Sequence, residues 1–376
     1  MKKTLVALAV AAVAASANAT TVYNQNGTKV DVGGRVDVML GKFGDAQRTD
    51  LRNNNSRVEF KAEHEVQNGL KAIGAVRFGL GDKENEDSSF EGVKVSKLWL
   101  GLKHNDIGKV TFGKQDTTAD NVELNDHTYI FGGNNNLVTS GDKVVSFRTA
   151  DIQLAEGQTL GFGADYGFGE AHKTHIKNGA GNKHIKLKNT YGLSAFYTGN
   201  FGDVKVNANA GYTVRNENNV AGPIGYTKTD NQKQAWRLAT QVEFGPASLG
   251  IEYGKTTSKD KAQKTNDGSM ASIEVGAKYA VLPDVLNVYT QWQRNSIKAG
   301  SVVSTFEFSL ANVALEEFDV DVHKKAVQNV FIVGADYAFN KNLLAYAEFA
   351  NSRVKAPKKA ENVRESFYAA GLRVYF

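Results

Sequence analysis

The chain has 376 residues, no cysteine, 37 glycines, four prolines and a formal net charge of +5 at pH 7. The absence of cysteine excludes disulfide staples, thiolate zinc sites and a cysteine nucleophile, and abundant glycine with scarce proline is typical of many strands joined by tight turns. The near balance of 45 basic and 40 acidic residues, without a basic block, argues against nucleic acid as a partner.

The first nineteen residues have the pattern of a secretory signal peptide. Two lysines follow Met1, residues 5–17 are apolar, and residues 17–19 (Ala-Asn-Ala) form a small-x-small cleavage site. We therefore expect export, with a mature chain that begins at Thr20 and a net charge of +3 after loss of Lys2 and Lys3. The alternative is a buried N-terminal helix. No later stretch approaches the roughly 20 apolar residues that a transmembrane helix needs.

Strand-like alternation with period two runs through the rest of the chain. Val58, Phe60 and Ala62, for example, alternate with charged residues at 57, 59, 61 and 63. Similar segments occur at 30–40, 97–103, 236–244, 273–279 and 331–339. Each segment is about ten residues long, which is the length of a tilted strand that crosses a membrane.

Short turns and long polar loops alternate between these segments. We expect seven short turns, at 67–69, 105–108, 155–157, 201–202, 245–246, 282–284 and 340–342. We expect eight long loops, at about 44–55, 81–92, 115–142, 168–187, 215–231, 257–268, 296–324 and 355–363. Fifteen connections predict an all-β fold over residues 20–376, a sixteen-stranded antiparallel transmembrane β-barrel with short periplasmic turns and long external loops. A soluble β-sandwich or propeller is the alternative, but its opposite face would carry less charge.

The chain ends on an aromatic residue after an apolar stripe formed by Tyr368, Leu372, Val374 and Phe376. Termini of soluble domains usually fray into water. The last strand of a membrane barrel must instead pair and face lipid. We therefore expect this strand to close the barrel by pairing with the strand that carries Arg35.

At this point the chain resembles the general bacterial porins, trimeric channels of Gram-negative outer membranes. The resemblance is carried by residues 22–35 (VYNQNGTKVDVGGR), by the loop at 115–142 and by the last strand. The start and the loops are similar to the Haemophilus/Pasteurella-type branch. The resemblance implies a non-enzymatic, water-filled channel for passive diffusion of small hydrophilic solutes and ions. It also implies a homotrimer in the outer membrane, in contact with lipid and lipopolysaccharide, with no cofactor and no metal. The barrel-assembly machinery would recognise Tyr368, Leu372, Val374 and Phe376.

In this family the third long loop folds into the barrel and narrows it. Here that loop carries four acidic residues, Asp116, Asp120, Glu123 and Asp126, and its tip (Ile130, Phe131, Gly132 and Gly133) is similar to the family's Phe-Gly-Gly bend. The resemblance places a basic wall opposite, at Arg35, Arg57, Lys97 and Arg148. Strand parity agrees, because the neighbours Val36, Val58, Leu98 and Phe147 are apolar and would face lipid.

Ile130 departs from the family pattern, which has an acidic residue directly before Phe-Gly-Gly. The loop is also one residue shorter between Lys114 and Gly132. Loss of an acid leaves the basic wall less opposed. We expect weaker cation preference than in relatives with both acids, or a slight anion preference.

The loop at 81–92 resembles the family's second loop, which contacts a neighbouring subunit. Its acidic residues, Asp82, Glu84, Glu86, Asp87 and Glu91, could meet Lys114 of the next chain. The alternative is a solvated acidic loop.

Three other functions compete with a channel. An outer-membrane hydrolase would need a Ser/His/acid set at the rim, and only His127 lies in the third loop, beside Asp126 and Thr128. His172, His175 and His184 share one long loop and could bind a metal, although no strand or helix is expected to fix their geometry. An adhesin or receptor barrel would have fewer strands and no inserted loop.

Overall fold

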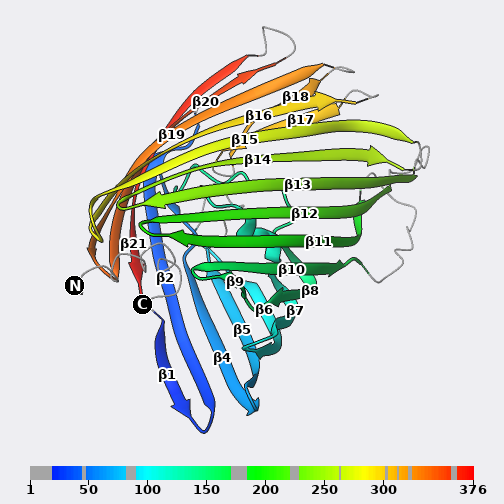
Figure 1. Cartoon of the computed structure of the whole chain (residues 1–376). Coiled ribbons are helices and arrows are strands. Elements are labelled where there is room, and N and C mark those ends of the chain that lie inside the picture. The colour runs from blue at the N-terminus through cyan, green and yellow to red at the C-terminus, as the bar shows by residue number, and fades with distance from the viewer. Residues whose placement is uncertain are drawn as a thin grey trace.

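The computed structural model describes residues 19–44, 48–81, 90–170, 184–220, 228–261, 264–300, 304–310, 313–320, 324–356 and 362–376. Nearly all regular structure in these residues is β-strand, and one short 3-10 helix, η1 (Thr118–Val122), interrupts it (Figure 1). No helix in the described part of the chain is long and apolar enough to cross a bilayer. The expected signal peptide, apart from Ala19, lies outside the described residues.

Sixteen strands form a closed antiparallel ring in which each strand pairs with two neighbours, and this confirms the predicted fold class. In ring order they are β2 (Thr28–Lys42), β4 (Arg57–Gln67), β5 (Leu70–Leu80), β6 (Val93–His104), β7 (Gly108–Asp116), β8 (Ser140–Thr149), β10 (Gln158–Phe168), β11 (His184–Phe201), β12 (Val204–Val220), β13 (Lys228–Phe244), β14 (Ala247–Asp260), β15 (Thr265–Leu282), β16 (Leu286–Ala299), β19 (Lys325–Asn340), β20 (Leu343–Lys355) and β21 (Val363–Tyr375).

Five further strands are not members of the sixteen-stranded ring. β1 (Thr20–Gln25) and β3 (Asp50–Asn53) pair with β2, and β9 (Ile152–Ala155) pairs with β10. The fourth and fifth, β17 (Ser304–Leu310) and β18 (Val313–Val320), form a separate two-stranded hairpin within the expected loop at 296–324. The sequence did not predict β1, whose turn into β2 is made by Asn26 and Gly27 at φ of 51° and 72°. These positive φ values favour Asn-Gly and suit a tight hairpin.

All seven predicted short turns occur between the expected strands, but two predicted long loops are largely wrong. β12 and β13 stay paired to the Val220–Lys228 pair, and β14 and β15 to the Asp260–Thr265 pair. The loops predicted at 215–231 and 257–268 are therefore mostly strand. The loops were predicted from polar side chains, and polar side chains indicate only that a segment lies in water. Backbone hydrogen bonds between the strands continue into that water-exposed region, so the strands extend beyond the part that faces lipid.

The two faces of the sheet invert the usual arrangement of a soluble protein. Apolar side chains on the outer face are exposed, with Leu100 at 67 % and Leu238 at 55 %. Charged and polar side chains on the inner face are buried, and Arg237 and Glu252 are each 1 % exposed. This pattern suits an outer face in lipid and a polar lumen.

Closure of the ring brings the last residue onto the first ring strand. β21 pairs with β2 from Arg35–Tyr375 to Lys42–Tyr368, as predicted. Gly34 and Phe376 exchange two backbone hydrogen bonds, of 2.9 and 3.1 Å. A Cβ atom at Gly34 would lie 2.5 Å from the ring of Phe376, so glycine is needed for this close approach.

The inverted surface leads to a first prediction. Leu238→Arg places a charge on the outer face of β13, and we expect it to weaken insertion into vesicles by about 2–4 kcal/mol. Asn207→Arg is the matched control, because Asn207 hydrogen-bonds Glu243 on the inner face and the new charge would stay in the lumen. Folding titrations followed by heat-modifiable gel mobility measure both. Equal loss of insertion in the two variants would contradict the assignment of the faces.

Candidate functional site

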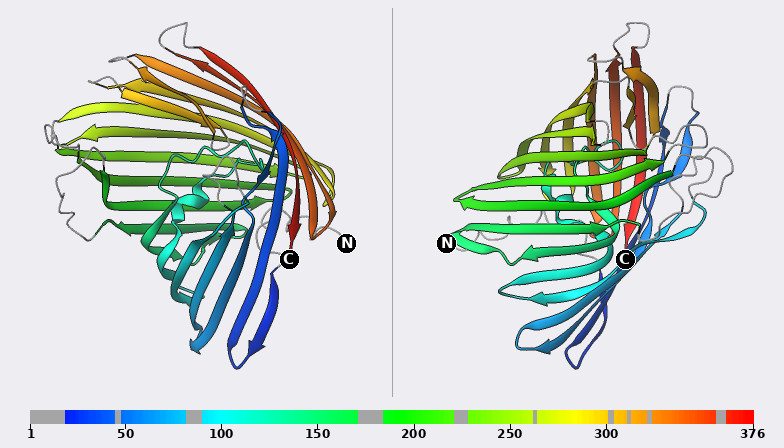
Figure 2. Two further views of the ribbon diagram at one scale, coloured as in Figure 1. Left: turned by 180° about the vertical axis from the view of Figure 1, so that it is seen from behind. Right: turned by 90° about the vertical axis from the view of Figure 1, so that its right-hand side faces the viewer.

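One long connection, residues 117–139 between β7 and β8, lies inside the ring, and we call it the constriction loop. Figure 2 shows this cyan segment, with η1, on the inner side of the ring in both views. Thr117 and Thr139 close its base through a backbone hydrogen bond of 2.8 Å. The loop is therefore held at its base before it crosses the lumen.

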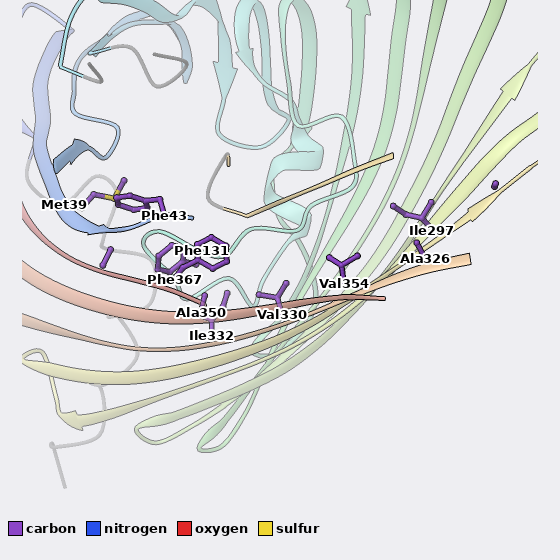
Figure 3. Packing of buried hydrophobic residues seen from close by; sticks show 12 residues of the cluster. Met39, Phe43, Phe131, Ile297, Ala326, Val330, Ile332, Ala350, Val354 and Phe367 are labelled. Carbon is purple, nitrogen blue, oxygen red and sulfur yellow. The ribbon is translucent and has the colours of Figure 1, made fainter. Parts of the chain in front are cut away.

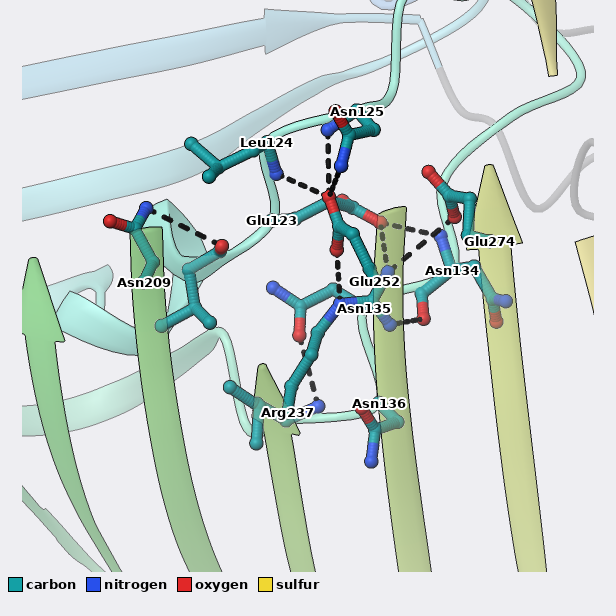
Figure 4. Close-up of polar contacts among 12 residues, drawn as sticks. Glu123, Leu124, Asn125, Asn134, Asn135, Asn136, Asn209, Arg237, Glu252 and Glu274 are labelled. Carbon is teal, nitrogen blue, oxygen red and sulfur yellow. Dashed lines mark hydrogen bonds and ion pairs between the residues drawn. The ribbon is translucent and has the colours of Figure 1, made fainter. Parts of the chain in front are cut away.

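Wall carboxylates hold the first half of this loop by accepting its backbone N–H groups. Asp165 on β10 accepts from the amide of Thr118 at 3.0 Å. Glu252 on β14 accepts from the amides of Leu124 and Asn125 at 2.6 and 2.7 Å (Figure 4). Hydrogen bonds to ionised groups are among the stronger ones in proteins, so these two residues fix the loop against the wall.

Arg237 on β13 joins the two halves of the constriction loop. Its Nε donates to Glu252 at 2.5 Å, and its Nη1 donates to the carbonyl of Asn134 at 2.5 Å. Its Nη2 lies 3.4 Å from Glu123 and 3.5 Å from Glu274 (Figure 4). A buried arginine with these partners ties the outgoing limb, the returning limb and the wall together.

A third carboxylate, Glu348 on β20, holds the loop tip. It accepts hydrogen bonds from three successive backbone amides, those of Tyr129, Ile130 and Phe131, the last two at 3.1 and 3.0 Å. The hydroxyl of Tyr289 donates a further bond of 2.8 Å to the same carboxylate. The tip is thus held on the wall opposite the base of the loop.

Apolar packing adds to this anchor. Phe131 is fully buried in a cluster on the inner wall, with ring centroids 6.3 Å from Phe43 and 6.0 Å from Phe367 (Figure 3). Ile130 packs against the same cluster. Ile130 therefore serves the attachment of the tip and leaves no charge there.

Two glycines after Phe131 let the tip turn. A Cβ atom at Gly132 would lie 1.9 Å from Oγ1 of Thr128 and 2.3 Å from Oδ1 of Asp126. Gly133 has a φ of +86°, in the region that side chains disfavour. The Phe-Gly-Gly bend identified in the sequence therefore has a steric basis.

Five basic residues on neighbouring strands form a surface that we call the basic wall: Arg373 on β21, Arg35 on β2, Arg57 on β4, Arg77 on β5 and Lys97 on β6. Arg35 lies directly opposite Arg57, and Arg77 opposite Lys97. Three members have carboxylate partners: Arg373 with Asp37 at 2.6 Å, Arg77 with Glu59 at 2.9 Å, and Lys97 with Asp116. Arg35 donates instead to the carbonyl of Asn55 at 3.1 Å.

Arg148, which the sequence assigned to the same wall, lies in a different row. Arg148 is directly opposite Lys109 on β7, and Lys109 is directly opposite Lys103 on β6. On β6, Lys103 lies six residues nearer to the short turns than Lys97. Arg148 pairs with Asp151 at 3.0 Å beside a turn. It therefore contributes charge to the short-turn end of the lumen and is separate from the basic wall.

The four predicted loop acids divide into two pairs. Asp116 binds Lys97, and Asp120 interacts electrostatically with Lys97 and Arg77, so this pair faces the basic wall. Glu123 accepts from the amide of Asn134 at 2.8 Å, and Asp126 accepts from the amide of Thr128 at 3.0 Å, so this pair faces the loop itself.

Burial raises the pKa of Glu123 to about 7, and the charge of Asp126 acts in the same direction. Arg237 opposes this rise. Glu123 is held by Arg237 and by the amide of Asn134, so Asp116 and Asp120 are the acids directed at the basic wall.

Sequence reasoning missed several residues of this site, including Arg77, Arg373, Glu252 and Glu348. The parity rule could have found Arg77 and Arg373, because apolar residues flank each of them. Nothing in the sequence distinguishes Glu252 or Glu348 from other inward-facing acids. Their role arises from where the loop crosses the lumen.

The residues considered for catalysis do not form a triad. The hydroxyl of Thr128 donates to Asp126 at 2.6 Å, and Nε2 of His127 is buried without a hydrogen-bond partner in the described structure. Burial lowers the pKa of His127 to about 4. No group of three or more His, Asp or Glu residues that could hold a metal occurs among the described residues. His172 and His175 lie outside them.

Comparison with known proteins identifies what this architecture resembles. A family model described as Gram-negative porin matches residues 4–357. A major outer membrane protein of Pasteurella multocida strain Pm70 is 33 % identical over the full length of both chains. Among solved structures, the trimer form of in-vitro folded OmpT of Vibrio cholerae has a TM-score of 0.66 at 20 % identity, covering 93 % of this chain and 99 % of that one. The anion-selective porin from Comamonas acidovorans has a TM-score of 0.62 at 17 % identity, covering 93 % and 100 %.

The tip anchor leads to a second prediction. Glu348→Ala removes the acceptor of three backbone amides. One hydrogen bond to a charged group contributes about 1.5 kcal/mol, which corresponds to about a tenfold change in the equilibrium between attached and detached loop. We expect protease cleavage within 117–139 to accelerate at least about tenfold and open-channel current noise to increase. The control is Glu243→Ala, since Glu243 binds Lys205 and Asn207, which both lie on β12 in the wall. Unchanged cleavage and noise in Glu348→Ala would show that the tip is held without this carboxylate.

Proposed function

Since the chain belongs to the Gram-negative porin family, and is therefore an outer-membrane protein that forms a water-filled diffusion channel, we propose that the gap between its constriction loop and its basic wall sets its ion selectivity. The observation that carries this proposal is the one-sided position of the loop. Its anchors lie on β10, β14 and β20, whereas the basic wall lies on β21, β2, β4, β5 and β6.

The width of the ring makes such a gap necessary. A barrel of sixteen strands is too wide for its own side chains to fill, so water occupies the lumen. A loop bound along one wall leaves the open path along the other. Small hydrophilic solutes then pass between the constriction loop, with Asp120, on one side and the basic wall on the other, by passive diffusion in the field of these charges.

The charges along this path favour anions weakly. Arg77, Arg373 and Lys97 are each neutralised by a carboxylate partner. Arg35 and Arg57 lie side by side, and neither forms an ion pair with a carboxylate in the described part of the chain. The exposed acid of the loop, Asp120, interacts with Lys97 and Arg77, and Ile130 adds no charge. We therefore propose a slight anion preference.

The remaining features of the family are proposed for this chain. The expected signal peptide at 1–19 directs export, and the strand ending in Phe376 is the part that the barrel-assembly machinery recognises. The chain acts as a channel and not as an enzyme, and lipid and lipopolysaccharide surround it. Support for this role comes from the family match and from the relative in Pasteurella multocida.

A homotrimer is supported by the family and by the trimer form of the Vibrio cholerae OmpT structure. The loop at 81–92 would reach a neighbouring subunit, but of its acids only Glu91, which is exposed, lies among the described residues. Lys114, its expected partner, pairs with Asp142 of the same chain at 3.0 Å.

Selectivity provides a third prediction. We expect the zero-current potential of the wild-type channel in a KCl gradient to show weak anion preference. Coulomb's law gives about 0.5 kcal/mol for the attraction between a permeating anion and one arginine ~8 Å away in water. Loss of both charges in Arg35→Gln/Arg57→Gln removes about 1 kcal/mol, so the anion-to-cation permeability ratio should fall at least about fivefold at low salt. The control Arg35→Lys/Arg57→Lys keeps the charge and should keep the potential. Strong cation selectivity of the wild type would contradict the proposal.

Oligomeric state provides a fourth prediction. The protein reconstituted in a planar bilayer should close in three equal conductance steps under voltage, because each subunit carries its own pore. Lys114→Glu would place a like charge against the acids of the neighbouring 81–92 loop, and we expect it to weaken the trimer on unheated gels. Single-step closure would argue for a monomeric channel, and absence of conductance would favour an adhesin.

A further inference from the structure

A polar pocket of about 280 Å³ lies between the returning limb of the constriction loop and the barrel wall. The loop lines it with residues 136–140, and the wall lines it with Thr213 and Arg215 on β12, Lys233 and Ala235 on β13, and Thr256 on β14. We call it the loop-side pocket. Its strands carry no member of the basic wall, so the pocket is separate from the gap that we propose selects ions.

The pocket lies on the external side of the contacts that Arg237 makes with the constriction loop. On β13, Lys233 is four residues from Arg237 in the direction of Lys228, where the strand meets a long external loop. At ~3.3 Å per residue this is a distance of about 13 Å. Arg215 lies directly opposite Lys233 on the neighbouring strand. A solute that enters from outside therefore meets the pocket before it reaches the gap.

Two basic side chains of the pocket share one carboxylate. Glu217 forms an ion pair with Nε of Arg215 and lies 4.0 Å from Nζ of Lys233, which leaves this group of three with a net charge of +1. Both Nη atoms of Arg215 have no partner among the described residues. Asp142, at the start of β8, is itself paired with Lys114 at 3.0 Å. Because like charges at directly opposed strand positions are destabilising, a bound anion would stabilise this arrangement.

Hydroxyl groups supply further hydrogen-bond donors beside these charges. Thr139, Ser140 and Thr256 all line the pocket. The hydroxyl oxygen of Thr256 accepts a hydrogen bond of 3.1 Å from the side-chain amide of Asn136. In the part of the chain that the structure describes, none of these three hydroxyls donates a hydrogen bond. A hydroxyl has one donor and two acceptor lone pairs, so all three can still bind a polar solute.

We propose that the loop-side pocket binds a small hydroxylated monocarboxylate, of the sugar-acid type, before the solute passes the gap. The two Nη groups of Arg215 match the two oxygens of a carboxylate, and Lys233 adds a second positive charge. The hydroxyls of the pocket bind those of the solute. The volume corresponds to about nine water molecules at ~30 Å³ each, which is room for one monosaccharide acid. The inference rests on the channel function and is independent of how the gap selects ions.

Charge favours a carboxylate over other anions in this pocket. A phosphate monoester carries about −1.5 to −2 charges at neutral pH, which exceeds the net charge of +1 on Arg215, Lys233 and Glu217. A chloride ion would balance the charge, but it would leave the hydroxyls of the pocket without a partner. A neutral sugar would use the hydroxyls and leave the charge unbalanced. A sugar acid matches both parts of the site.

Titration calorimetry of the full chain in detergent, with sodium glucuronate at low ionic strength, tests the proposal. Arg215→Gln/Lys233→Gln removes the charged hydrogen bonds to the carboxylate and should weaken binding at least about tenfold. The control Lys205→Gln/Lys278→Gln removes two charges from the short-turn halves of β12 and β15 and should leave binding unchanged. Ser140→Trp fills the pocket and should weaken binding severalfold while the charges remain. Heat-modifiable gel mobility verifies that each variant is folded.

Three outcomes would overturn the proposal. The first is equal glucuronate affinity in Arg215→Gln/Lys233→Gln and wild type, and the second is equal loss of affinity in the control variant. The third is binding of glucose or of glucose 6-phosphate as tight as that of glucuronate. Arg35→Gln/Arg57→Gln, which tests the ion selectivity of the gap, should still bind glucuronate. Failure of this proposal is therefore distinguishable from failure of the proposed selectivity mechanism.

Discussion

Closure of the backbone hydrogen-bond ring is the constraint on which the rest of this structure depends. An open sheet edge in lipid would leave a row of unpaired N–H and C=O groups, each costing several kcal/mol. The pairing of β21 with both β20 and β2 removes that edge. Once the ring is closed, its two faces meet different solvents, and the alternation of apolar and charged residues follows along every strand. The ring therefore explains why a protein with buried Arg237 and exposed Leu100 is stable as a folded barrel.

The constriction loop is subject to the same requirement, that its backbone N–H groups find hydrogen-bond acceptors. Its backbone crosses a polar lumen without a strand to pair with, so its amides need acceptors from the wall. Asp165, Glu252 and Glu348 supply these acceptors at three separated points. These three carboxylates bind the loop, whereas the charges that line the water-filled path belong to other residues, those of the basic wall and Asp120. This division of roles explains why Glu123 and Asp126, although acidic and in the loop, are not directed at the basic wall.

The alternation of short turns and long loops predicted the sixteen-strand ring. Strand parity predicted the inward direction of Arg35, Arg57 and Lys97, because an alternating pattern reports directly on two different solvents. It did not predict the height of a residue along the barrel, and Arg148 was therefore placed with residues from which it is separated by about six positions. Long-range partners were also beyond reach. The contact of Glu348 with the loop tip joins residues more than 200 positions apart, and nothing local in either segment records it.

The hairpin at the start of the chain has a consequence for how the ring closes. β1 covers the edge of β2 from Thr28 to Val32, and β21 covers the same edge from Arg35 to Lys42. Ala19 and Phe376 meet over Gly33 and Gly34, where the two coverings end. β1 therefore acts as an end-stop: the final strand can slide no further along β2 without displacing it. A slip of one residue would turn every side chain of the strand to the wrong solvent, and β1 blocks that slip in the direction of Thr28.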